Sequence, residues 1–229
     1  MISISRTVTP SDEWWEAVIR GVRNPYNSWD KSDSEWRYIS VPVQDGVESE
    51  CRLFIGENDL NLMKKLANAG DDHGKFLRML PVITTINAPF YWWKEMDTYK
   101  IGTVADSCST MHTITAKRFE RDDFSIDDTV TADAMAKMMN DILDCYNDAK
   151  NSGDAEEAKR MWRLLIQTLP TSYNQTRTWM ANYQVLKHIY NARKGHRLSE
   201  WETFRCWIRG LPYSELITGE GELYRMPSP

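Results

Sequence analysis

Three consecutive helical patterns in the second half of the chain constrain its fold most strongly. Residues 154–169 form the second pattern, which ends before a proline, and residues 178–193 form the third, which ends near a glycine. Because each pattern is long enough for a full helix, the chain must be largely helical. In the first pattern, residues 131–150, the apolar side chains recur at i, i+3, i+4, i+7, i+8 and i+11 and therefore share one helical face: Met135, Met138, Met139, Ile142, Leu143 and Tyr146.

The first half of the chain mixes strand and helix patterns. Alternating and β-branched residues predict strands over 1–8, 37–43, 48–55 and 81–89. Helical spacing predicts helices over 13–22 and 57–69, from Asp72, and from Phe90, and a capping box formed by Ser199 and Glu202 predicts the start of the last helix. The predicted fold class is therefore α+β: mostly helical, with a small antiparallel sheet.

The length of the chain suits one large domain. A compact chain of 229 residues buries enough surface to fold without a disulfide or a metal ion. The stretch after Pro212 is short of apolar residues and rich in glycine and proline. We therefore predict a single α+β domain over residues 1–212 and a loosely held tail over residues 213–229.

Charge and composition exclude several classes of partner. A net charge of −5 and a pI near 5.5 argue against binding of duplex nucleic acid, which normally needs a cluster of lysine and arginine. No run approaches about 18 apolar residues, so no membrane span is expected. The four histidines and four cysteines lack metal-site spacing, so no metal is expected. With no export signal at the start, the cytoplasm is the expected location.

Residues 99–112, YKIGTVADSCSTMH, interrupt the apolar patterns with small and hydroxylated residues. Gly102 and the hydroxyl groups would let the backbone approach a ligand closely. A solvated surface connection explains the same composition, and both interpretations stay open. Cys108 has only His112 as a nearby electropositive partner, so an ordinary thiol is preferred to a nucleophile.

The order of elements in the chain resembles the flavin-dependent thymidylate synthases. His73 precedes a strand that ends in Ala-Pro at Pro89, and a helix and a polar segment follow it. Much later, RLLIQTLP leads to a helix that carries Asn182, Leu186 and Arg193. The resemblance covers about residues 58–210.

The resemblance implies a homotetramer that binds FAD and a pyrimidine nucleotide at sites shared between subunits. Any surviving reaction would be a one-carbon or hydride transfer on the nucleotide, but the resemblance identifies no catalytic residue. By position, it assigns one residue to the nucleotide phosphate, Arg193. It assigns these residues to the cofactor: His73, Lys100, Thr103, Asp106 and Asn182.

The family signature RHRxxSxNExSxR is degraded in this chain. Its first two positions fall on Thr98 and Tyr99, and its last arginine falls on Thr110. An arginine–phosphate contact contributes about 1.5–3 kcal/mol, so losing two of them lowers affinity by about two or more decades. Chemistry identical to that of the family is therefore not expected. The alternative is an inactive oligomeric binding or interaction module that keeps the fold, from a virus or prophage and hence in the host cytoplasm; a third is an ordinary α+β domain with an accidental likeness.

Simpler structural roles compete with the site roles of several residues. Arg193 near a helix C-terminus would complement the helix dipole. His73 fits a capping or core position, and Glu202 is explained by the capping box without any chemistry. The four aromatics at 90–93 must meet another element, a subunit or a flat ligand, and a subunit interface is slightly favoured over a ligand.

Overall fold

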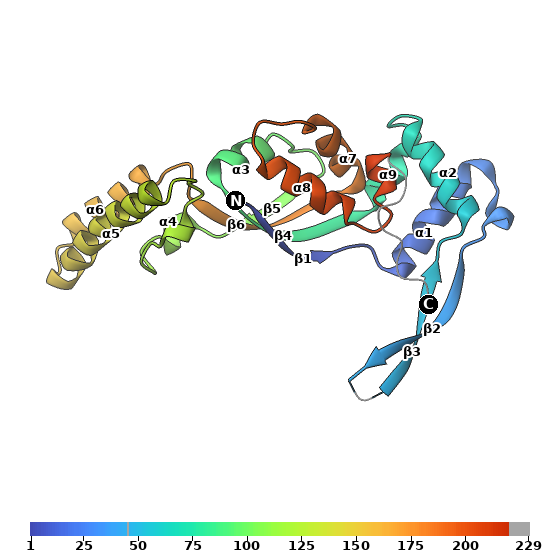
Figure 1. Cartoon of the computed structure of the whole chain (residues 1–229), viewed down its shortest axis with the longest axis horizontal. Coiled ribbons are helices and arrows are strands. Elements are labelled where there is room, and N and C mark those ends of the chain that lie inside the picture. The colour runs from blue at the N-terminus through green and yellow to red at the C-terminus, as the bar shows by residue number, and fades with distance from the viewer. Residues whose placement is uncertain (45, 220–229) are drawn as a thin grey trace. The chain divides into compact units, whose positions relative to one another are not determined.

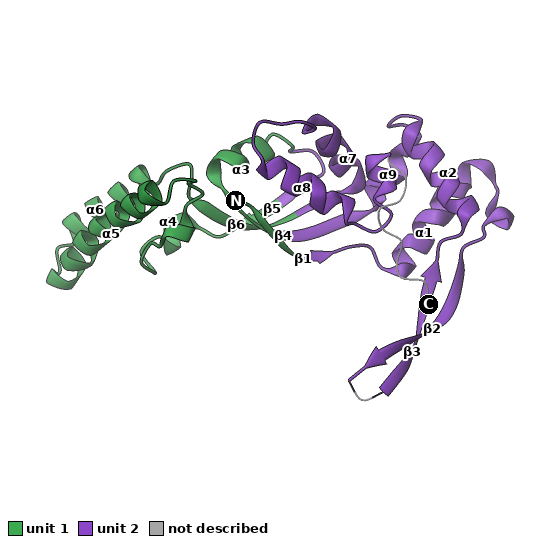
Figure 2. Cartoon of the chain, in the orientation of Figure 1, with its two compact units in different colours: residues 1–5, 85–99, 105–179 green, residues 6–84, 100–104, 180–229 purple. Residues whose placement is uncertain are grey.

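The computed structural model describes residues 1–44 and 46–219, and Asp45 and residues 220–229 lie outside the described part. The chain divides into two compact units, which Figure 2 shows in different colours. The first unit comprises Met1–Ser5, Thr85–Tyr99 and Ala105–Trp179. The second comprises Arg6–Thr84, Lys100–Val104 and the chain from Met180. Each unit is described by itself below.

A four-stranded sheet has the order β1-β4-β6-β5. The strands are β1 (Ser3–Val8), β4 (Pro81–Pro89), β6 (Asn174–Asn182) and β5 (Val104–Ser107). Every strand starts in one unit and ends in the other. Val82, Thr84, Ile86 and Ala88 of β4 are fully buried while the residues between them are more exposed, which is the period of two expected for a strand. The strands predicted at 1–8 and 81–89 are confirmed.

The prediction of one helix over 178–193 is wrong in its first five residues. Residues 174–182 are strand β6, and helix α7 begins only at Tyr183 and ends at Ala192. Trp179 and Ala181 are buried whereas Met180 between them is exposed, so this segment follows the period of a strand. The strand runs into the helix at Asn182 with no glycine or proline to mark the change.

Helices α5 (Thr129–Ser152) and α6 (Ala155–Thr168) in the first unit confirm the two helical patterns, although Met138 of the first stripe is exposed. Gly153 ends α5 in the left-handed region at φ 80°, and the Asp154 carboxylate accepts the Glu157 N–H at 3.0 Å to begin α6. The loop ahead of α5 contains α4 (Thr110–Thr113) and the short 3₁₀ helix η4 (Arg121–Asp123). Helices α5 and α6 and this loop share one apolar core, which consists of Ile114, Phe119, Phe124, Ala136, Met139, Leu143 and Leu165.

Helix α3 (Phe90–Met96) uses two of its four aromatics for the core of the first unit. Trp92 and Trp93 are 0% and 1% exposed, and the Trp93 indole N–H donates to the Gln175 carbonyl at 3.0 Å. These two side chains therefore meet another element of the chain itself. Phe90 and Tyr91 are half-buried.

The second unit gathers the remaining helices. Helices α1 (Asp12–Arg23) and α2 (Glu57–Asn68) fall where they were predicted, but the helix predicted from Asp72 is the short 3₁₀ helix η3 (Gly74–Met79). The packed chain continues past residue 212, because Leu216 and Ile217 of α9 are buried. The rest of the predicted tail, residues 220–229, lies outside the described residues. The elements are α1 (Asp12–Arg23), η1 (Asn24–Tyr26), η2 (Trp29–Lys31), α2 (Glu57–Asn68), η3, α7, α8 (Glu200–Arg209) and α9 (Glu215–Thr218).

Strands β2 (Glu35–Val43) and β3 (Gly46–Phe54) pair antiparallel, from Glu35 opposite Phe54 to Val43 opposite Gly46. The two strands predicted at 37–43 and 48–55 are confirmed, and Asp45 between them lies outside the described residues. In the second unit this hairpin extends away from α1 and α2 (Figure 1), and most of its residues are exposed.

The capping box predicted for α8 is wrong, although the helix begins where it was expected. The Ser199 side chain makes no capping hydrogen bond. The Glu202 carboxylate instead accepts from Arg205 at 2.6 Å and from Arg209 at 2.8 Å. Two arginines one and two turns further along offer this carboxylate stronger, charge-assisted bonds than a backbone N–H would.

Candidate functional site

Helix α7 carries the two predicted site residues of the C-terminal region, one at each end. The Asn182 side-chain oxygen accepts the Val185 N–H at 3.1 Å and so caps the start of the helix. Arg193 is the residue at its C-terminal cap. Leu186 and Ile189 are fully buried, which confirms the predicted inward face. A helix of ten residues is about 15 Å long, so α7 separates the Asn182 and Arg193 backbones by about that distance.

The glycine of the polar segment lies at the N-terminal end of α7. A Cβ on Gly102 would lie 3.1 Å from Asn182 Nδ2 and 3.2 Å from Val185 Cγ2. Gly102 also has φ +76°, where L side chains are strained. Lys100 and Thr103 flank this contact, Lys100 being exposed and Thr103 half-buried. The structure therefore brings the segment that carries Lys100 and Thr103 to the capped end of α7.

A second cation lies at the same end of α7. The Arg78 Nε donates to the Gln184 side-chain oxygen at 3.2 Å, and the Leu80 carbonyl accepts the Tyr183 N–H at 3.0 Å. Arg78 is therefore beside the first turn of α7, where the helix dipole favours negative charge. Sequence reasoning did not select Arg78 or Gln184. The signal for Arg78 was its position between His73 and the strand that ends at Pro89, within the segment that carries the family resemblance.

His73 sits at the N-cap position of η3, and its side chain makes no capping bond there. The imidazole is exposed, so the core role considered for it does not apply. Asp106 belongs to the other unit, where it is exposed on β5. The structure thus places Lys100, Thr103 and Asn182 in one neighbourhood within the second unit, and Asp106 outside that unit.

Helix α8 fixes the C-terminal end of α7 through two arginine–aromatic contacts. The Arg193 guanidinium lies 4.3 Å from the centre of the Trp201 ring, and the Arg205 guanidinium lies 4.3 Å from that of Tyr190. Arg205 Nε also donates to the Tyr190 carbonyl at 3.1 Å. Such stacking orients a guanidinium and keeps its charge. Arg193 therefore contacts Trp201 of α8, an interaction that a role in complementing the helix dipole does not explain.

Metal and membrane sites have no support in the described part of the chain. Within residues 1–44 and 46–219, no three His, Cys, Asp or Glu side chains gather as metal ligands would. In the same residues, no helix is both long enough and apolar enough to cross a bilayer.

Comparison with known proteins gives likeness only at the level of structure. No protein-family model matches the sequence, and no curated protein does. Two crystal structures of thymidylate synthase X from Helicobacter pylori with FAD and dUMP match with TM-scores of 0.65 and 0.66 at 14% identity, over 95% of this chain and 97% and 98% of theirs. The chain has the fold of the flavin-dependent thymidylate synthases.

A UMP/dUMP methylase, PolB from Streptomyces cacaoi bound with 5-Br dUMP, matches with a TM-score of 0.59 at 15% identity, over 96% of each chain. The likeness to the flavin-dependent thymidylate synthase fold therefore extends well beyond residues 58–210, where the sequence resemblance was seen.

Within this thymidylate synthase fold, the first signature position has a local structural role. The Thr98 hydroxyl donates to the Glu95 carbonyl at 2.7 Å and so closes the end of α3. Close by in the sequence, the Cys108 N–H donates to the Thr176 carbonyl at 2.9 Å, and the Gln175 amide donates to the Cys108 carbonyl at 2.8 Å. A backbone-bonded threonine cannot supply the charge of the missing arginine.

Proposed function

We propose that this protein binds FAD and a pyrimidine nucleotide monophosphate as a divergent protein of the flavin-dependent thymidylate synthase fold. The observation that carries the proposal is the fold shared over 95% of the chain with structures that hold FAD and dUMP. A UMP/dUMP methylase with the same fold supports a pyrimidine nucleotide as the ligand class.

The capped end of α7 is the proposed place of the anionic cofactor. Two cations, Arg78 and Lys100, accompany the positive end of the helix dipole there, and Thr103 adds a hydroxyl group. These groups fit an anionic ligand. The family resemblance also assigns His73 and Asp106 to the cofactor.

Arg193 is the proposed ligand of the nucleotide phosphate. Its contact with the Trp201 ring limits the conformations of the guanidinium, which reduces the entropy lost when it binds a phosphate group. FAD, when bound, supplies hydride chemistry, and the proposed reaction is a one-carbon or hydride transfer on the nucleotide. Arg193 would orient the phosphate end of that substrate.

The proposal includes a homotetramer that works in the cytoplasm, or in the host cytoplasm if the chain is viral. In the resembled family the sites are shared between subunits, so residues of two protomers can contribute to one site. Mass measurement of the purified protein in solution tests this part, and a monomer would contradict it.

The visible spectrum and nucleotide binding of the purified protein test the proposed function. We expect a flavin spectrum, or uptake of added FAD, and a rise in melting temperature with dUMP that Arg193→Gln reduces. Lys137→Gln is the matched control, because Lys137 is exposed on α5. A colourless protein that takes up no FAD and does not respond to dUMP would overturn the proposal and leave the inactive interaction module. Growth of a thymidine auxotroph on expression of the chain would show that turnover survives.

A further inference from the structure

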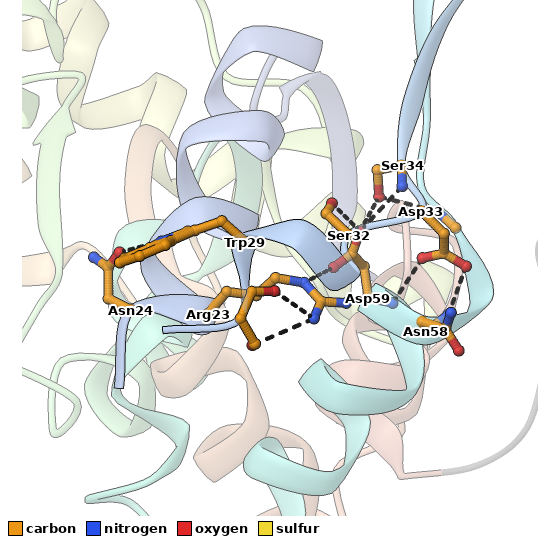
Figure 3. A network of polar contacts seen from close by, with 10 residues as sticks. Arg23, Asn24, Trp29, Ser32, Asp33, Ser34, Asn58 and Asp59 are labelled. Carbon is orange, nitrogen blue, oxygen red and sulfur yellow. Dashed lines mark hydrogen bonds and ion pairs between the residues drawn. The ribbon is translucent and has the colours of Figure 1, made fainter. Parts of the chain in front are cut away.

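A buried ion pair joins the end of α1 to the start of α2 (Figure 3). Arg23 and Asp59 are 4% and 1% exposed, and Arg23 Nε donates to Asp59 Oδ1. The other carboxylate oxygen accepts from the Ser32 hydroxyl at 2.7 Å, the Ser34 hydroxyl at 2.6 Å and the Ser34 N–H at 3.1 Å. The Asp59 carboxylate is therefore fully used within the protein.

The Arg23 guanidinium, in contrast, keeps part of its donor capacity. Its Nη1 donates to the carbonyl and hydroxyl oxygens of Ser28 at 3.1 and 3.4 Å. Its Nη2 donates to no acceptor within residues 1–44 and 46–219. This nitrogen is not sealed inside the protein, so it can reach the solvent. A buried arginine with an open, unused N–H pair is uncommon, because unmet donors are costly.

In front of Arg23 lies a surface cavity of about 690 Å³ that is largely open to solvent. Arg23 and Lys31 are the two charged residues of its lining; Asp59 balances the charge of Arg23, so Lys31 supplies the net positive charge. The Lys31 ammonium is exposed and makes no ion pair with a described residue. The lining consists of Arg23, Tyr26, Ser28, Lys31, Asn58 and Leu62.

The N-terminus of α2 does not provide the anion site, because it is already capped. The Asp33 carboxylate accepts the N–H groups of Asn58 at 2.9 Å and of Asp59 at 3.1 Å. A Cβ on Gly56 would lie 2.2 Å from the Asp33 carboxyl carbon, so the loop packs tightly against the helix. Any anion in the cavity must therefore bind side chains, and the walls that carry them are held in place by this packing.

We propose that this cavity binds the phosphate group of a small phosphorylated ligand. Arg23 Nη2 and the Lys31 ammonium contact the phosphate oxygens, and Ser28 and Asn58 supply neutral donors. The ring of Tyr26, 56% exposed, and the side chain of Leu62 form the wall for the organic part of the ligand. None of these residues belongs to the site proposed for FAD or the pyrimidine nucleotide.

Calorimetric titration of the full chain with inorganic phosphate and with phenyl phosphate, at constant ionic strength, tests the proposal. We expect saturable binding of both, with phenyl phosphate binding more tightly because of Tyr26. Lys31→Gln weakens both about tenfold, whereas Lys137→Gln leaves them unchanged. Tyr26→Ala removes the preference for phenyl phosphate. Acetate titrated in the same way tests whether the site takes any anion, and equally tight acetate binding would overturn the phosphate assignment.

Substitution of Asn58 separates binding from folding. Asn58→Asp places a negative charge in the cavity and in the first turn of α2, where the helix dipole favours it but the nearby carboxylates of Asp33, Glu57 and Asp59 oppose it. Because these effects oppose each other, we expect the unfolding free energy to change by less than about 1 kcal/mol, together with at least tenfold weaker phosphate binding. Absence of saturable phosphate binding by the unsubstituted protein would overturn the proposal. Phosphate binding by Lys31→Gln and Asn58→Asp that is as tight as that of the unsubstituted protein would also overturn it.

Discussion

Gly102 lies against the side chain of Asn182, close enough that a Cβ on the glycine would lie 3.1 Å from the amide nitrogen. This relationship explains one of the small residues in the polar segment. The backbone of Gly102 approaches α7 of the same chain, which already accounts for the small residue. The ligand interpretation then depends on the neighbouring side chains of Lys100 and Thr103.

Replacing Gly102 tests this contact. Gly102→Ala should destabilise the fold by more than about 1 kcal/mol, because a φ of +76° strains an L residue and the new methyl group also presses on Asn182 and Val185. Gly153→Ala is the matched control: its φ is +80°, but nothing lies within 4 Å of its Cβ, so it should lose only the strain of about 1 kcal/mol. Chemical denaturation measures both values, and equal losses would contradict the contact.

Asn182 offers a way to separate capping from ligand binding. Asn182→Ala removes the acceptor for the Val185 N–H and should cost about 1 kcal/mol of unfolding free energy. Asn182→Asp keeps that acceptor and should preserve stability, but it adds a negative charge where an anionic cofactor is proposed. We therefore expect full stability and weaker FAD binding for the aspartate variant. Undiminished FAD binding by that variant would exclude Asn182 from the cofactor site.

Local patterns in the sequence were sufficient where local spacing decides the structure. The apolar stripes of α5 and α6, the β-branched run of β4 and the inward face of α7 at Leu186 and Ile189 were all predictable. Each depends on residues a few positions apart, whose common face buries apolar area. The start of α8 was also predicted, but for the wrong reason, because its capping box does not form.

Strand β6 could not be recognised in the same way because its partners, β4 and β5, lie far from it in the sequence. The segment has both a helical and an alternating pattern, and pairing with distant strands decided between them. The alternation of Trp179 and Ala181 with Met180 was the available signal. The Arg23–Asp59 pair was equally unpredictable, since its partners are 36 residues apart and no spacing rule joins them.

Substitution of Glu202 should destabilise the protein more than substitution of Ser199, whereas a capping box would make Ser199 the more important residue. Ser199→Ala should change the unfolding free energy by less than about 0.5 kcal/mol, because its side chain caps nothing. Glu202→Gln should cost about 1 kcal/mol, because the carboxylate binds Arg205, which is largely buried, and Arg209. The cost stays modest because Glu202 is itself 56% exposed. A larger loss for Ser199→Ala than for Glu202→Gln would support the capping box instead.

The Asp59 carboxyl should make stability depend on pH in the acid range. Burial acts to raise its pKa, but the hydrogen bonds from Ser34 and Ser32 and the Arg23 guanidinium together lower the pKa below its ordinary value. A carboxyl group whose pKa is lower in the folded state stabilises the fold at neutral pH, and this contribution is lost as the pH falls below about 4. The stability of the protein should therefore decline over that range.

Asp59→Asn isolates this contribution. At pH 7 the variant should lose roughly 3–5 kcal/mol, because the buried Arg23 charge is left unpaired. The difference in unfolding free energy between the variant and the unsubstituted protein should decrease as the pH falls below about 4, because protonation then removes the negative charge from Asp59 in the unsubstituted protein. Asp133→Asn is the control. Asp133 pairs with Arg121 on the surface, so this variant should lose less than about 1 kcal/mol of unfolding free energy. Urea denaturation at several pH values measures both variants. A difference in unfolding free energy for Asp59→Asn that stays constant down to about pH 3 would show that the ionised Asp59 carboxylate does not stabilise the fold.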